Sequence, residues 1–354
     1  MKALFLEEPG QPLRMLERPD PVPGPGEVVV TLDAASLNRR DYWITQGLYP
    51  GIRTPVVLGS DGAGVVSATG DGVDSELAGK EVLVNPAKNW GEDPAAQGAD
   101  FEVLGMPTDG TFATHLVTTP GQLLSIPGHL GMREAAALPI AALTAWRAVF
   151  TQGKLRAGQK ILITGIGGGV ALFCAQLAIA AGAEVYLTSS SEEKIDRVVE
   201  MGARGGVNYR GADWAKEFRD RHGQVQLIVD GAGGKDYSRL LDIALPAGRL
   251  VSYGSTAGAP ESLDLFRIFW KQLRIIGSTM GSLGDLHAAL AAADSGGLRS
   301  VVDRTLPLGS AAEAHQRLGE FVAHGGAGAV REHDPPVGGG AHRRRGRRQG
   351  ARDR

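Results

Sequence analysis

The sequence has very little cysteine: Cys174 is a single thiol among 354 residues. One thiol can form neither an internal disulfide nor the thiolate cluster of a structural zinc site. No apolar run approaches the roughly 20 residues that a membrane-spanning helix needs. The first residues, MKALFLEEPGQPL, also lack the apolar core of a signal peptide. These absences favour a cytoplasmic protein with no membrane partner.

The charges are unevenly spread along the chain. The formal net charge is −2, but residues 343–354 (RRRGRRQGARDR) hold seven arginines and one acid. The rest of the chain has 30 basic and 38 acidic residues, a net charge near −8. Because nucleic-acid binding needs clustered positive charge, an acidic body makes nucleic acid an improbable main partner. An arginine run can bind polyanions, but a solvated segment is the commoner outcome, and we expect residues 331–354 to form a disordered basic tail.

The first 125 residues read as short strands separated by turn signals. The segments EVVVTLDAASL, GAGVVSATG, KEVLVNP and FATHLVTTP combine β-branched residues with Gly, Pro and Asp punctuation. Residues 87–110 show little periodicity, which predicts a long loop. Residues 133–150 predict a helix that is interrupted at Pro139.

From residue 160 onward, strand and helix patterns alternate. Strands are predicted at 160–164, 184–188, 207–209, 226–230, 249–253 and 274–278, with helices at 170–181, 192–201, 213–221 and 236–244. Such alternation is typical of a doubly wound parallel sheet. A strand, a turn and a helix follow at 300–321. We therefore expect two domains: a discontinuous β-rich domain at 1–125 and 272–330, and a nucleotide-binding domain at 126–271.

The segment KILITGIGGGVALFCAQLAIAAGAEVYLTSS (160–190) joins a strand, a glycine-rich turn, an apolar helix and a second strand. Its turn reads Gly165-x-x-Gly168-x-x-Ala171. Glycines let the backbone approach a pyrophosphate closely, and a helix that begins near Val170 offers unpaired N–H groups and the positive end of its dipole. A glycine-rich turn alone is weak evidence, but this strand–turn–helix–strand context predicts a dinucleotide site.

A carboxylate that holds the adenosine ribose normally follows about 20 residues later. Here that place holds Thr188, Ser189, Ser190 and Ser191. Hydroxyls leave room for a 2′-phosphate, and Lys194 and Tyr209 are a nearby cation and hydroxyl donor in the sequence. The serines also fit a simple helix cap, and both interpretations can hold together. We expect NADPH as the cofactor.

Taken together, these motifs resemble those of the medium-chain dehydrogenase/reductase superfamily, in its zinc-independent quinone oxidoreductase-like branch. The resemblance covers roughly residues 1–325 and rests on the order and spacing of several segments. They are SLNRRDYWITQGLYP (36–50), GSDGAGVVSATG (59–70), AAALPIAALTAWRAV (135–149), TGIGGGVALFCAQLA (164–178), VNYR (207–210), AGRLVSYG (247–254) and VVDRTLPLGSAAEAH (301–315). The resemblance implies an α/β fold, with a GroES-like β-rich catalytic domain and a Rossmann nucleotide domain.

The zinc-dependent relatives in this superfamily carry a metal-binding cysteine where Asn38 stands and a His-Glu pair where Ser60 and Asp61 stand. Residues 87–110 lack the cysteines of their second zinc lobe. Asn and Ser are poor zinc ligands, so we expect no metal. The resemblance then implies hydride transfer from NADPH to a quinone or an α,β-unsaturated carbonyl. An enoyl thioester reductase and a non-catalytic NADPH-binding sensor or partner protein are the alternatives.

The segment NRRDYWITQGLYP supplies the candidate catalytic residues. Asn38 is a candidate for holding the nicotinamide amide or the substrate carbonyl, and Tyr49 matches a proton-donating tyrosine of related enoyl thioester reductases. Tyr42 is a second candidate, and Asp41 is expected to orient the loop. Each has a plainer interpretation, since Tyr49-Pro50-Gly51 is a good turn and Tyr42 can simply pack. Arg39 and Arg40 either favour an anionic substrate or form a solvated pair.

The resemblance also implies a set of cofactor-binding residues, some of which the glycine-rich turn and the serines already indicate. They are Thr144, Gly165, Ile166, Gly168, Gly169, Val170, Ser189, Ser190, Lys194, Tyr209, Gly254 and Ser255. It further implies a homodimer or homotetramer that associates through the nucleotide-domain sheet. One departure concerns the C-terminus, where relatives end on a strand that returns to the first domain. Residues 324–354 start in that way and then become rich in Gly, Pro and Arg, which raises the prospect of a lost last strand.

Overall fold

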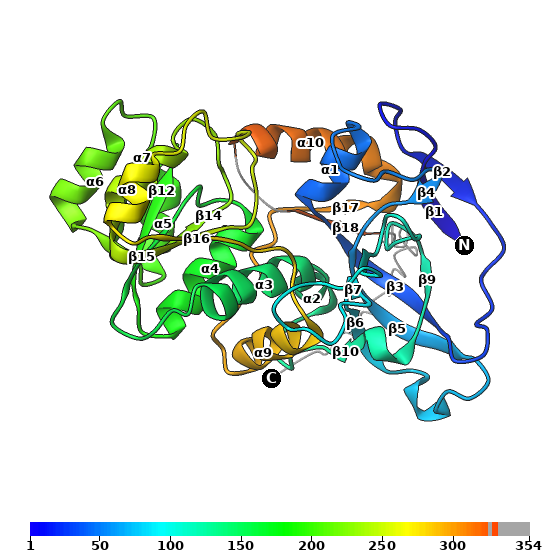
Figure 1. The fold of residues 1–354 in the computed structure, drawn as a ribbon. Helices are drawn as coiled ribbons and strands as arrows, with labels where there is room; N and C mark the ends of the chain where they lie inside the picture. Colours follow the sequence, from blue (N-terminus) through cyan, green and yellow to red (C-terminus); the bar gives the residue numbers. More distant parts are fainter. Residues whose placement is uncertain (325–327, 332–354) are drawn as a thin grey trace, which may run out of the picture.

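The computed structural model describes residues 1–324 and 328–331 and shows two lobes (Figure 1). The first lobe is built mainly of strands from both ends of the chain. The second contains a parallel sheet with helices on both faces. This arrangement confirms the expected fold class, a GroES-like β-rich unit joined to a Rossmann unit.

The first lobe is organised around one large sheet. Among the described residues this sheet has seven strands, in the order β10-β6-β5-β3-β18-β17, with β9 also paired to β3. Its strands are β3 (Val28–Leu37), β5 (Asp61–Thr69), β6 (Glu81–Val84), β9 (His115–Thr118), β10 (Leu123–Ser125), β17 (Thr305–Pro307) and β18 (Gly328–Arg331). The smaller strands are β1 (Lys2–Leu6), β2 (Arg14–Glu17) and β4 (Val56–Val57), which form one sheet, and β7 (Ala87–Lys88) and β8 (Glu102–Val103), which form a pair.

The second lobe contains a sheet of six parallel strands within the described part of the chain, in the order β13-β12-β11-β14-β15-β16. They are β11 (Lys160–Ile163), β12 (Glu184–Ser189), β13 (Gly205–Asn208), β14 (Val225–Asp230), β15 (Ala244–Ser252) and β16 (Arg274–Gly277). Strand β16 belongs to this sheet, although the expected domain boundary falls at residue 271. The order of the strands and their common direction are those of a doubly wound fold.

Successive side chains of these strands are buried on opposite faces, as a sheet covered on both sides requires. Ile161 and Ile163 belong to the core cluster beneath α3, α4, α5 and α9, whereas Leu162 packs under α6 and α7. The helices are α1 (Arg39–Thr45), α2 (Met132–Ala136), α3 (Pro139–Trp146), α4 (Gly169–Ala180), α5 (Glu192–Glu200), α6 (Trp214–His222), α7 (Tyr237–Ile243), α8 (Leu265–Trp270), α9 (Leu283–Asp294) and α10 (Ala311–His324). Pro139 begins α3, as the sequence predicted, because proline suits the first helical turn.

The chain returns to the first lobe through β17, α10 and β18. Strand β18 pairs antiparallel with β3 and parallel with β17, so the suspected loss of the last strand is wrong for residues 328–331. The expected basic tail from residue 332 onward lies outside the described residues. No described helix is long and apolar enough to cross a membrane.

A buried arginine joins the two lobes. Arg147 lies in the π-helical segment Arg147–Gln152 that follows α3, and it is 2% exposed. Its Nη1 lies 3.0 Å from Asp285 Oδ2 on α9, and its guanidinium also donates to the carbonyls of Pro94 and Ala95. The Trp90 ring lies 4.8 Å from the guanidinium carbon. This single cation therefore fastens the 87–110 loop of the first lobe to two helices of the second.

We expect Arg147→Met to lower the free energy of unfolding by about 3–5 kcal/mol, because it leaves the buried Asp285 carboxylate without its cationic partner. Chemical denaturation measures the loss. The control is Arg197→Ala, which removes an exposed pair with Glu193 on α5 and should cost far less. Equal, small losses in both variants would contradict the bracing role of Arg147.

Candidate functional site

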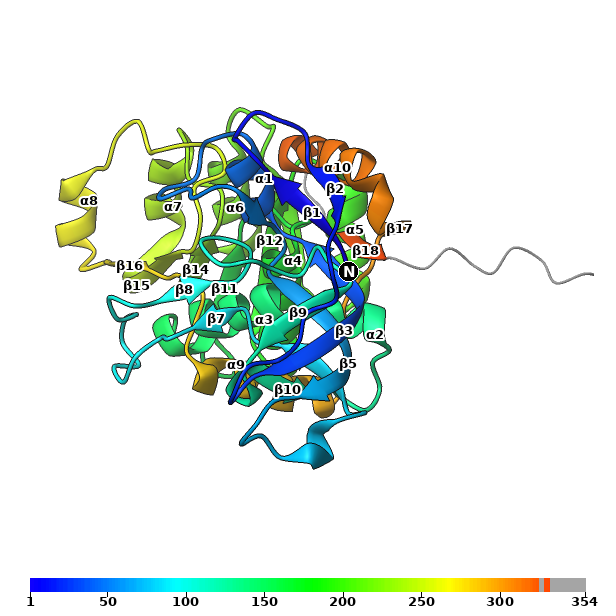
Figure 2. The same ribbon diagram turned by 90° about the vertical axis from the view of Figure 1, so that its right-hand side faces the viewer.

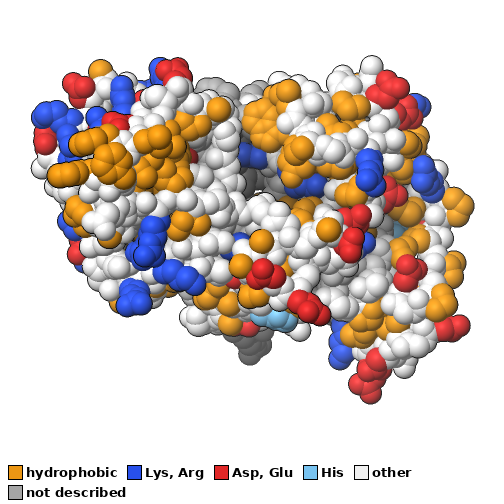
Figure 3. Space-filling view, viewed as in Figure 1, with side chains coloured by type: hydrophobic (Ala, Val, Ile, Leu, Met, Phe, Trp, Pro, Cys, Tyr) orange, Lys and Arg blue, Asp and Glu red, His pale blue; other side chains and the backbone are white. Residues whose placement is uncertain are grey.

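A cavity of about 1170 Å³ lies between the two lobes. The space-filling view shows it as a hollow at their junction (Figure 3). The second lobe lines it with the loops that follow β11, β12, β14 and β15, and the first lobe lines it with residues of α1 and its flanks. In a parallel sheet all strands end at the same edge, and ligands bind at that edge. The position is therefore that of a ligand site.

The glycine-rich turn forms one wall of this cavity. Gly165 and Gly167 have φ values of 63° and 133°, which are favourable for glycine and strained for other residues. The turn is tied to β12, because Ile166 N donates to the Thr188 carbonyl and Gly165 N donates to Thr188 Oγ1. No side chain caps α4, whose N-cap is Gly168. Its first N–H groups thus remain available to an anion in the cavity.

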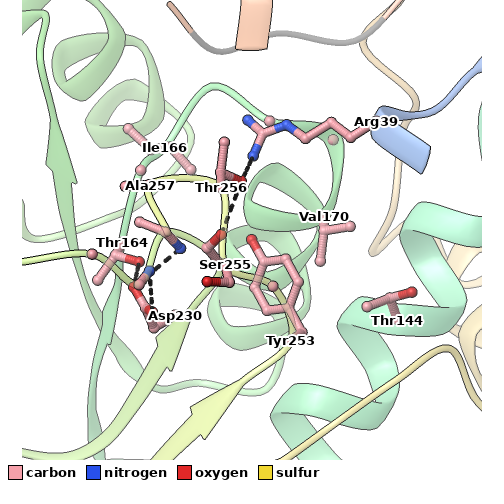
Figure 4. A pocket seen from close by; sticks show the side chains of 18 of the residues that line it. Arg39, Thr144, Thr164, Ile166, Val170, Asp230, Tyr253, Ser255, Thr256 and Ala257 are labelled. Carbon is pink, nitrogen blue, oxygen red and sulfur yellow. Dashed lines mark hydrogen bonds between the residues drawn. The ribbon is translucent and has the colours of Figure 1, made fainter. Parts of the chain in front are cut away.

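A buried carboxylate shapes the neighbouring loop. Asp230 ends β14 and accepts hydrogen bonds from Thr164 Oγ1 and from the backbone N–H of Gly233, at 2.9 Å (Figure 4). Burial raises the pKa of Asp230 above its ordinary value. The sequence analysis missed this residue, although an acid that ends the strand QLIVD before a glycine-rich stretch was an available signal. Asp230 holds the loops after β11 and β14 together at the cavity edge.

Arg39 crosses the cavity from the first lobe to the second. Its Nη1 donates to Thr256 Oγ1 at 2.8 Å, in the loop after β15 (Figure 4). A Cβ atom on Gly168 would lie 3.1 Å from Arg39 Nη2, so the guanidinium rests against the start of α4. Arg39 is half-buried and hydrogen-bonded, which differs from the solvated arginine pair considered from the sequence. A fixed positive charge thus stands beside the unpaired N–H groups of α4.

The end of β12 lies at another part of the cavity wall. Ser189, Ser190 and Tyr209 line the cavity, while Ser191 caps α5 by accepting from Lys194 N. The helix-cap interpretation therefore applies to Ser191, while Ser189 and Ser190 line the cavity. Lys194 lies in the first turn of α5 and is not among the residues that line the cavity. Its pKa is lowered, chiefly by burial.

Most of the predicted site residues meet in this one cavity. Those that line it are Asn38, Tyr49, Thr144, Gly165, Ile166, Gly168, Gly169, Val170, Ser189, Ser190, Tyr209, Gly254 and Ser255. Asp41, Tyr42 and Lys194 do not. Asp41 is fully buried and accepts from Asn38 N at 2.7 Å. Tyr42 packs edge-on against Trp43, with ring centroids 5.2 Å apart.

Tyr253 is a cavity residue that the sequence analysis did not identify. It precedes Gly254 and points toward the centre of the cavity, between Ser255 and Thr144 (Figure 4). A Cβ on Gly231 would lie 2.4 Å from the Tyr253 ring, so only glycine fits beside it. Burial raises the pKa of Tyr253, and its hydroxyl stays protonated at neutral pH.

Asn38 is held by a buried carboxylate. Its Nδ2 donates to Asp61 Oδ2 at 2.9 Å, and Asp61 also accepts from Ile140 N at 2.9 Å and from Ser36 Oγ. Burial raises the pKa of Asp61 to about 7, and hydrogen bonds to its carboxylate oppose part of that rise. Burial likewise raises the pKa of Asp41 to about 6, against the opposing effect of Arg40. Two buried carboxyls therefore lie behind the part of the cavity wall that contains Asn38.

The residues at the zinc position do not suit zinc. Asn38 and Ser60 are poor ligands for it, and the Asp61 oxygens already accept from three donors. The Arg40 guanidinium donates to Ser60 Oγ at 2.6 Å, which puts a cation where a divalent metal would need electron pairs. Across the described residues, no group of three or more His, Cys, Asp or Glu side chains is arranged to hold a metal.

A doubly wound lobe with an uncapped glycine-turn helix, set against a β-rich lobe across a cavity, is the arrangement of a two-lobed nucleotide-binding protein. Comparisons with known proteins identify the family. The family model "Alcohol dehydrogenase GroES-like domain" matches residues 24–128, and "Zinc-binding dehydrogenase" matches residues 169–295. The chain belongs to the medium-chain dehydrogenase/reductase superfamily, which confirms the predicted family.

Three relatives illustrate the match. The chain is 32% identical over 311 residues to the zinc-type alcohol dehydrogenase-like protein YogA of Leptosphaeria maculans, covering 83% of this chain and 87% of that one. It is 27% identical to the acryloyl-coenzyme A reductase of Sulfurisphaera tokodaii, covering 90% and 96%. A crystal structure of an NAD-dependent alcohol dehydrogenase superimposes with a TM-score of 0.87 at 35% identity, covering 94% and 99%. The protein is therefore an oxidoreductase of a pyridine nucleotide-dependent family.

The raised pKa of Asp61 predicts a specific pH dependence of stability. The folded chain binds this proton up to about pH 7, whereas the unfolded carboxyl releases it near its ordinary value of 3.8. The stabilisation is present at low pH and is lost as the pH rises through about 7. We expect D61N to become more stable relative to wild type as the pH rises from about 5 to about 8, so that the difference in free energy of unfolding, D61N minus wild type, becomes more positive.

Denaturant titrations across that pH range measure this difference. The free energy of unfolding of D61N is compared with that of wild type at each pH because other groups also change the stability. Burial lowers the pKa of His315 to about 4, so His315 makes both proteins more stable as the pH rises, and this effect cancels in the comparison. The control is Asp220→Asn, an exposed carboxyl whose pKa is lowered by Lys216, so it titrates below the range. A flat difference for D61N would show that Asp61 is ionised like an ordinary carboxyl.

Proposed function

We propose that the protein is an NADPH-dependent, zinc-independent oxidoreductase that reduces a quinone or an α,β-unsaturated carbonyl. The observation that carries the proposal is the division of one cavity into two ends. One end has the glycine turn, the start of α4 and Arg39, which suit a dinucleotide. The other end holds the apolar and aromatic side chains of Trp43, Leu48 and Tyr49 beside the polar Asn38 and Arg40. This mixture suits a small conjugated acceptor that carries a carbonyl oxygen.

The residues fit a dinucleotide along its whole length. The turn from Gly165 to Val170 and Arg39 would hold the pyrophosphate. Ser189, Ser190 and Tyr209 would meet the adenosine ribose. Thr144, Tyr253, Gly254 and Ser255 would surround the nicotinamide, since all four line the cavity and Tyr253 lies between Ser255 and Thr144 (Figure 4). When bound, reduced NADPH supplies the hydride.

The chain's own residues have three tasks at the acceptor end. The apolar side chains exclude water and orient a flat acceptor. Asn38, fixed by Asp61, offers a rigid polar group beside that acceptor. Tyr49 lines the cavity and is the proposed proton donor, while Asp41 positions Asn38 through the backbone rather than touching a ligand. Asp41 thus keeps the orienting role expected for it, and Tyr42, which packs against Trp43, has no part in the proposed chemistry.

The absence of zinc is part of the proposal because the donor set at Asn38, Ser60 and Asp61 does not suit the metal. An alcohol dehydrogenase of the zinc type needs a metal to hold an alkoxide. A conjugated acceptor does not, since hydrogen-bond donors and fixed charges can stabilise its developing negative charge. Reduction of a conjugated acceptor is thus the chemistry that this site supports best.

A second candidate is an enoyl thioester reductase. The likeness to an acryloyl-coenzyme A reductase over 90% of the chain favours it. Reduction of an enoyl thioester needs the same hydride and proton transfer and keeps the thioester intact, so the two candidates differ in the group attached to the acceptor's carbonyl carbon. A protein that binds NADPH without turnover is the non-enzymatic alternative, to be considered if no acceptor reacts.

We expect the protein to oxidise NADPH faster than NADH when a naphthoquinone or a simple enone is added. Absorbance at the reduced nicotinamide band follows the reaction, and crotonyl-coenzyme A tests the thioester candidate under the same conditions. Turnover of the thioester alone would favour the second candidate. Cofactor binding with no turnover on any acceptor would contradict the proposed function.

Cofactor preference has its own test at the end of β12. Ser189→Asp places a carboxylate where it would repel a 2′-phosphate and accept from ribose hydroxyls. We expect NADPH to bind at least about tenfold more weakly and NADH more tightly, measured by nucleotide fluorescence. Ser189→Asn is the uncharged control of the same size. Wild-type preference for NADH would mean that these serines do not select a phosphate.

We also propose that copies of the chain associate through the open edge of the second sheet. Strand β16 is an edge strand, and next to it α8 exposes Phe266 (60%), Phe269 (62%) and Trp270 (71%). Figure 2 shows α8 standing out from its lobe, and Figure 3 shows hydrophobic side chains gathered there. An antiparallel pairing of two β16 strands about a two-fold axis between Ile275 and Ile276 would set Arg274 opposite Gly277 of the second copy. The two Arg274 side chains would then not face each other.

Light scattering after size exclusion tests this assembly. We expect a dimer or tetramer for the wild type and a smaller species for the double change Phe269→Ser and Trp270→Ser. Val22→Ser removes an exposed apolar side chain of the first lobe and serves as control. A monomeric wild type at micromolar concentration would contradict the proposed interface.

A further inference from the structure

Arg40 is a buried cation in the wall of the cavity. The residue lines the cavity yet is only 9% exposed. Its Nη1 donates to Ser60 Oγ at 2.6 Å and to the Leu104 carbonyl at 2.7 Å, and its Nη2 donates to the Met106 carbonyl at 3.1 Å. All three acceptors are uncharged. The guanidinium is thus held firmly in place without being neutralised by its hydrogen-bond partners.

The charge of Arg40 is also not neutralised by an ion pair. Among the described residues, no carboxylate lies within salt-bridge distance of it, in contrast to Arg147 with Asp285. Its charge lowers the pKa of the neighbouring Asp41, although burial of that carboxyl has the larger effect. Burying a charge without a paired partner is costly. Such an arrangement concentrates positive potential where the surroundings screen it poorly.

The positive charge lies at the acceptor end of the cavity. The guanidinium carbon lies 5.3 Å from the centre of the Tyr49 ring, and Asn38, Arg40 and Tyr49 line the same region. Arg39, by contrast, rests at the start of α4 and is bonded to Thr256. The adjacent arginines therefore have different surroundings in one cavity, and Arg40 lies beside the residues whose donor set does not fit zinc.

We infer that Arg40 is the fixed positive charge that stabilises the negative charge developing on the acceptor oxygen. This inference rests on the proposed function. In that reaction the electrophilic carbon of the acceptor gains a hydride, and the conjugated π electrons move to the carbonyl oxygen. A proton then completes the reduction, while NADPH becomes NADP⁺. A charge that is already oriented needs no rearrangement as the oxygen becomes negative.

The test is a pair of variants that lose the same hydrogen-bond geometry but differ in charge. Arg40→Lys keeps the cation, whereas Arg40→Gln is neutral. We expect kcat to fall by about tenfold or less for Lys and by about 100-fold or more for Gln, with little change in NADPH affinity. Assays at about pH 6.5 keep the lysine at position 40 charged even if it is partly buried. Ser60→Ala, which removes one partner of Arg40 and keeps the charge, should behave like wild type.

A second readout separates an electrostatic role from a structural one. Across a series of naphthoquinones with graded electron-withdrawing substituents, the rate of Arg40→Gln should depend more steeply on the substituent than that of wild type. A merely structural role would lower all rates in proportion. Circular dichroism checks that each variant is folded, and Arg40→Met replaces the Gln variant if that one is not.

The possible outcomes separate a failure of the proposed function from a failure of the role inferred for Arg40. If the wild type oxidises NADPH with none of these acceptors, the proposed function fails. If the wild type turns over but the Lys and neutral variants lose activity equally, with unchanged substituent dependence, the role of Arg40 is overturned while the proposed function stands. A large gap between Lys and Gln, with a steeper substituent dependence, supports the inference.

Discussion

The parallel direction of the second sheet is the constraint on which the site depends. Because β11, β12, β14 and β15 all run the same way, the loops that follow them reach one edge. The glycine turn, the serines after β12, the Asp230 loop and the loop with Thr256 meet there for that reason. The first lobe then only has to cover this edge. It does so with α1 and the residues on either side of it, and the space between becomes the cavity.

Buried charges organise the junction between the lobes. Arg147 is paired with Asp285 and braces the 87–110 loop, so its role is structural. Arg39 links α1 to the loop after β15. Arg40 is bonded to uncharged groups alone, and Asp41 and Asp61 lie close by with raised pKa values. Their partners differ: the charge of Arg147 is paired with a carboxylate and stabilises the fold, whereas Arg39 and Arg40 are bonded to uncharged groups and their charges are available to a ligand.

Much of this fold follows from local sequence patterns. The strand–helix alternation, the glycine turn and the break at Pro139 were predictable because each depends on neighbouring residues. Contacts across the chain were not: Arg39 meets Thr256, and Asp230 meets Thr164, only once the sheet has formed. Lys194 was assigned to the cofactor because its position matches one that contacts the 2′-phosphate in the family that the sequence resembles. It lies in the first turn of α5 and is not among the residues that line the cavity, so its role stays a prediction.

The central claim is that one cavity between the lobes holds a pyridine nucleotide and the acceptor end to end. The most direct measurement is a crystal structure of the protein with NADP⁺ bound. The account predicts the pyrophosphate at the start of α4 beside Arg39, and the nicotinamide near Thr144 and Tyr253, with the apolar end beside Asn38 and Tyr49 left for the acceptor. A nucleotide bound elsewhere, or one whose nicotinamide points away from Asn38, would contradict it.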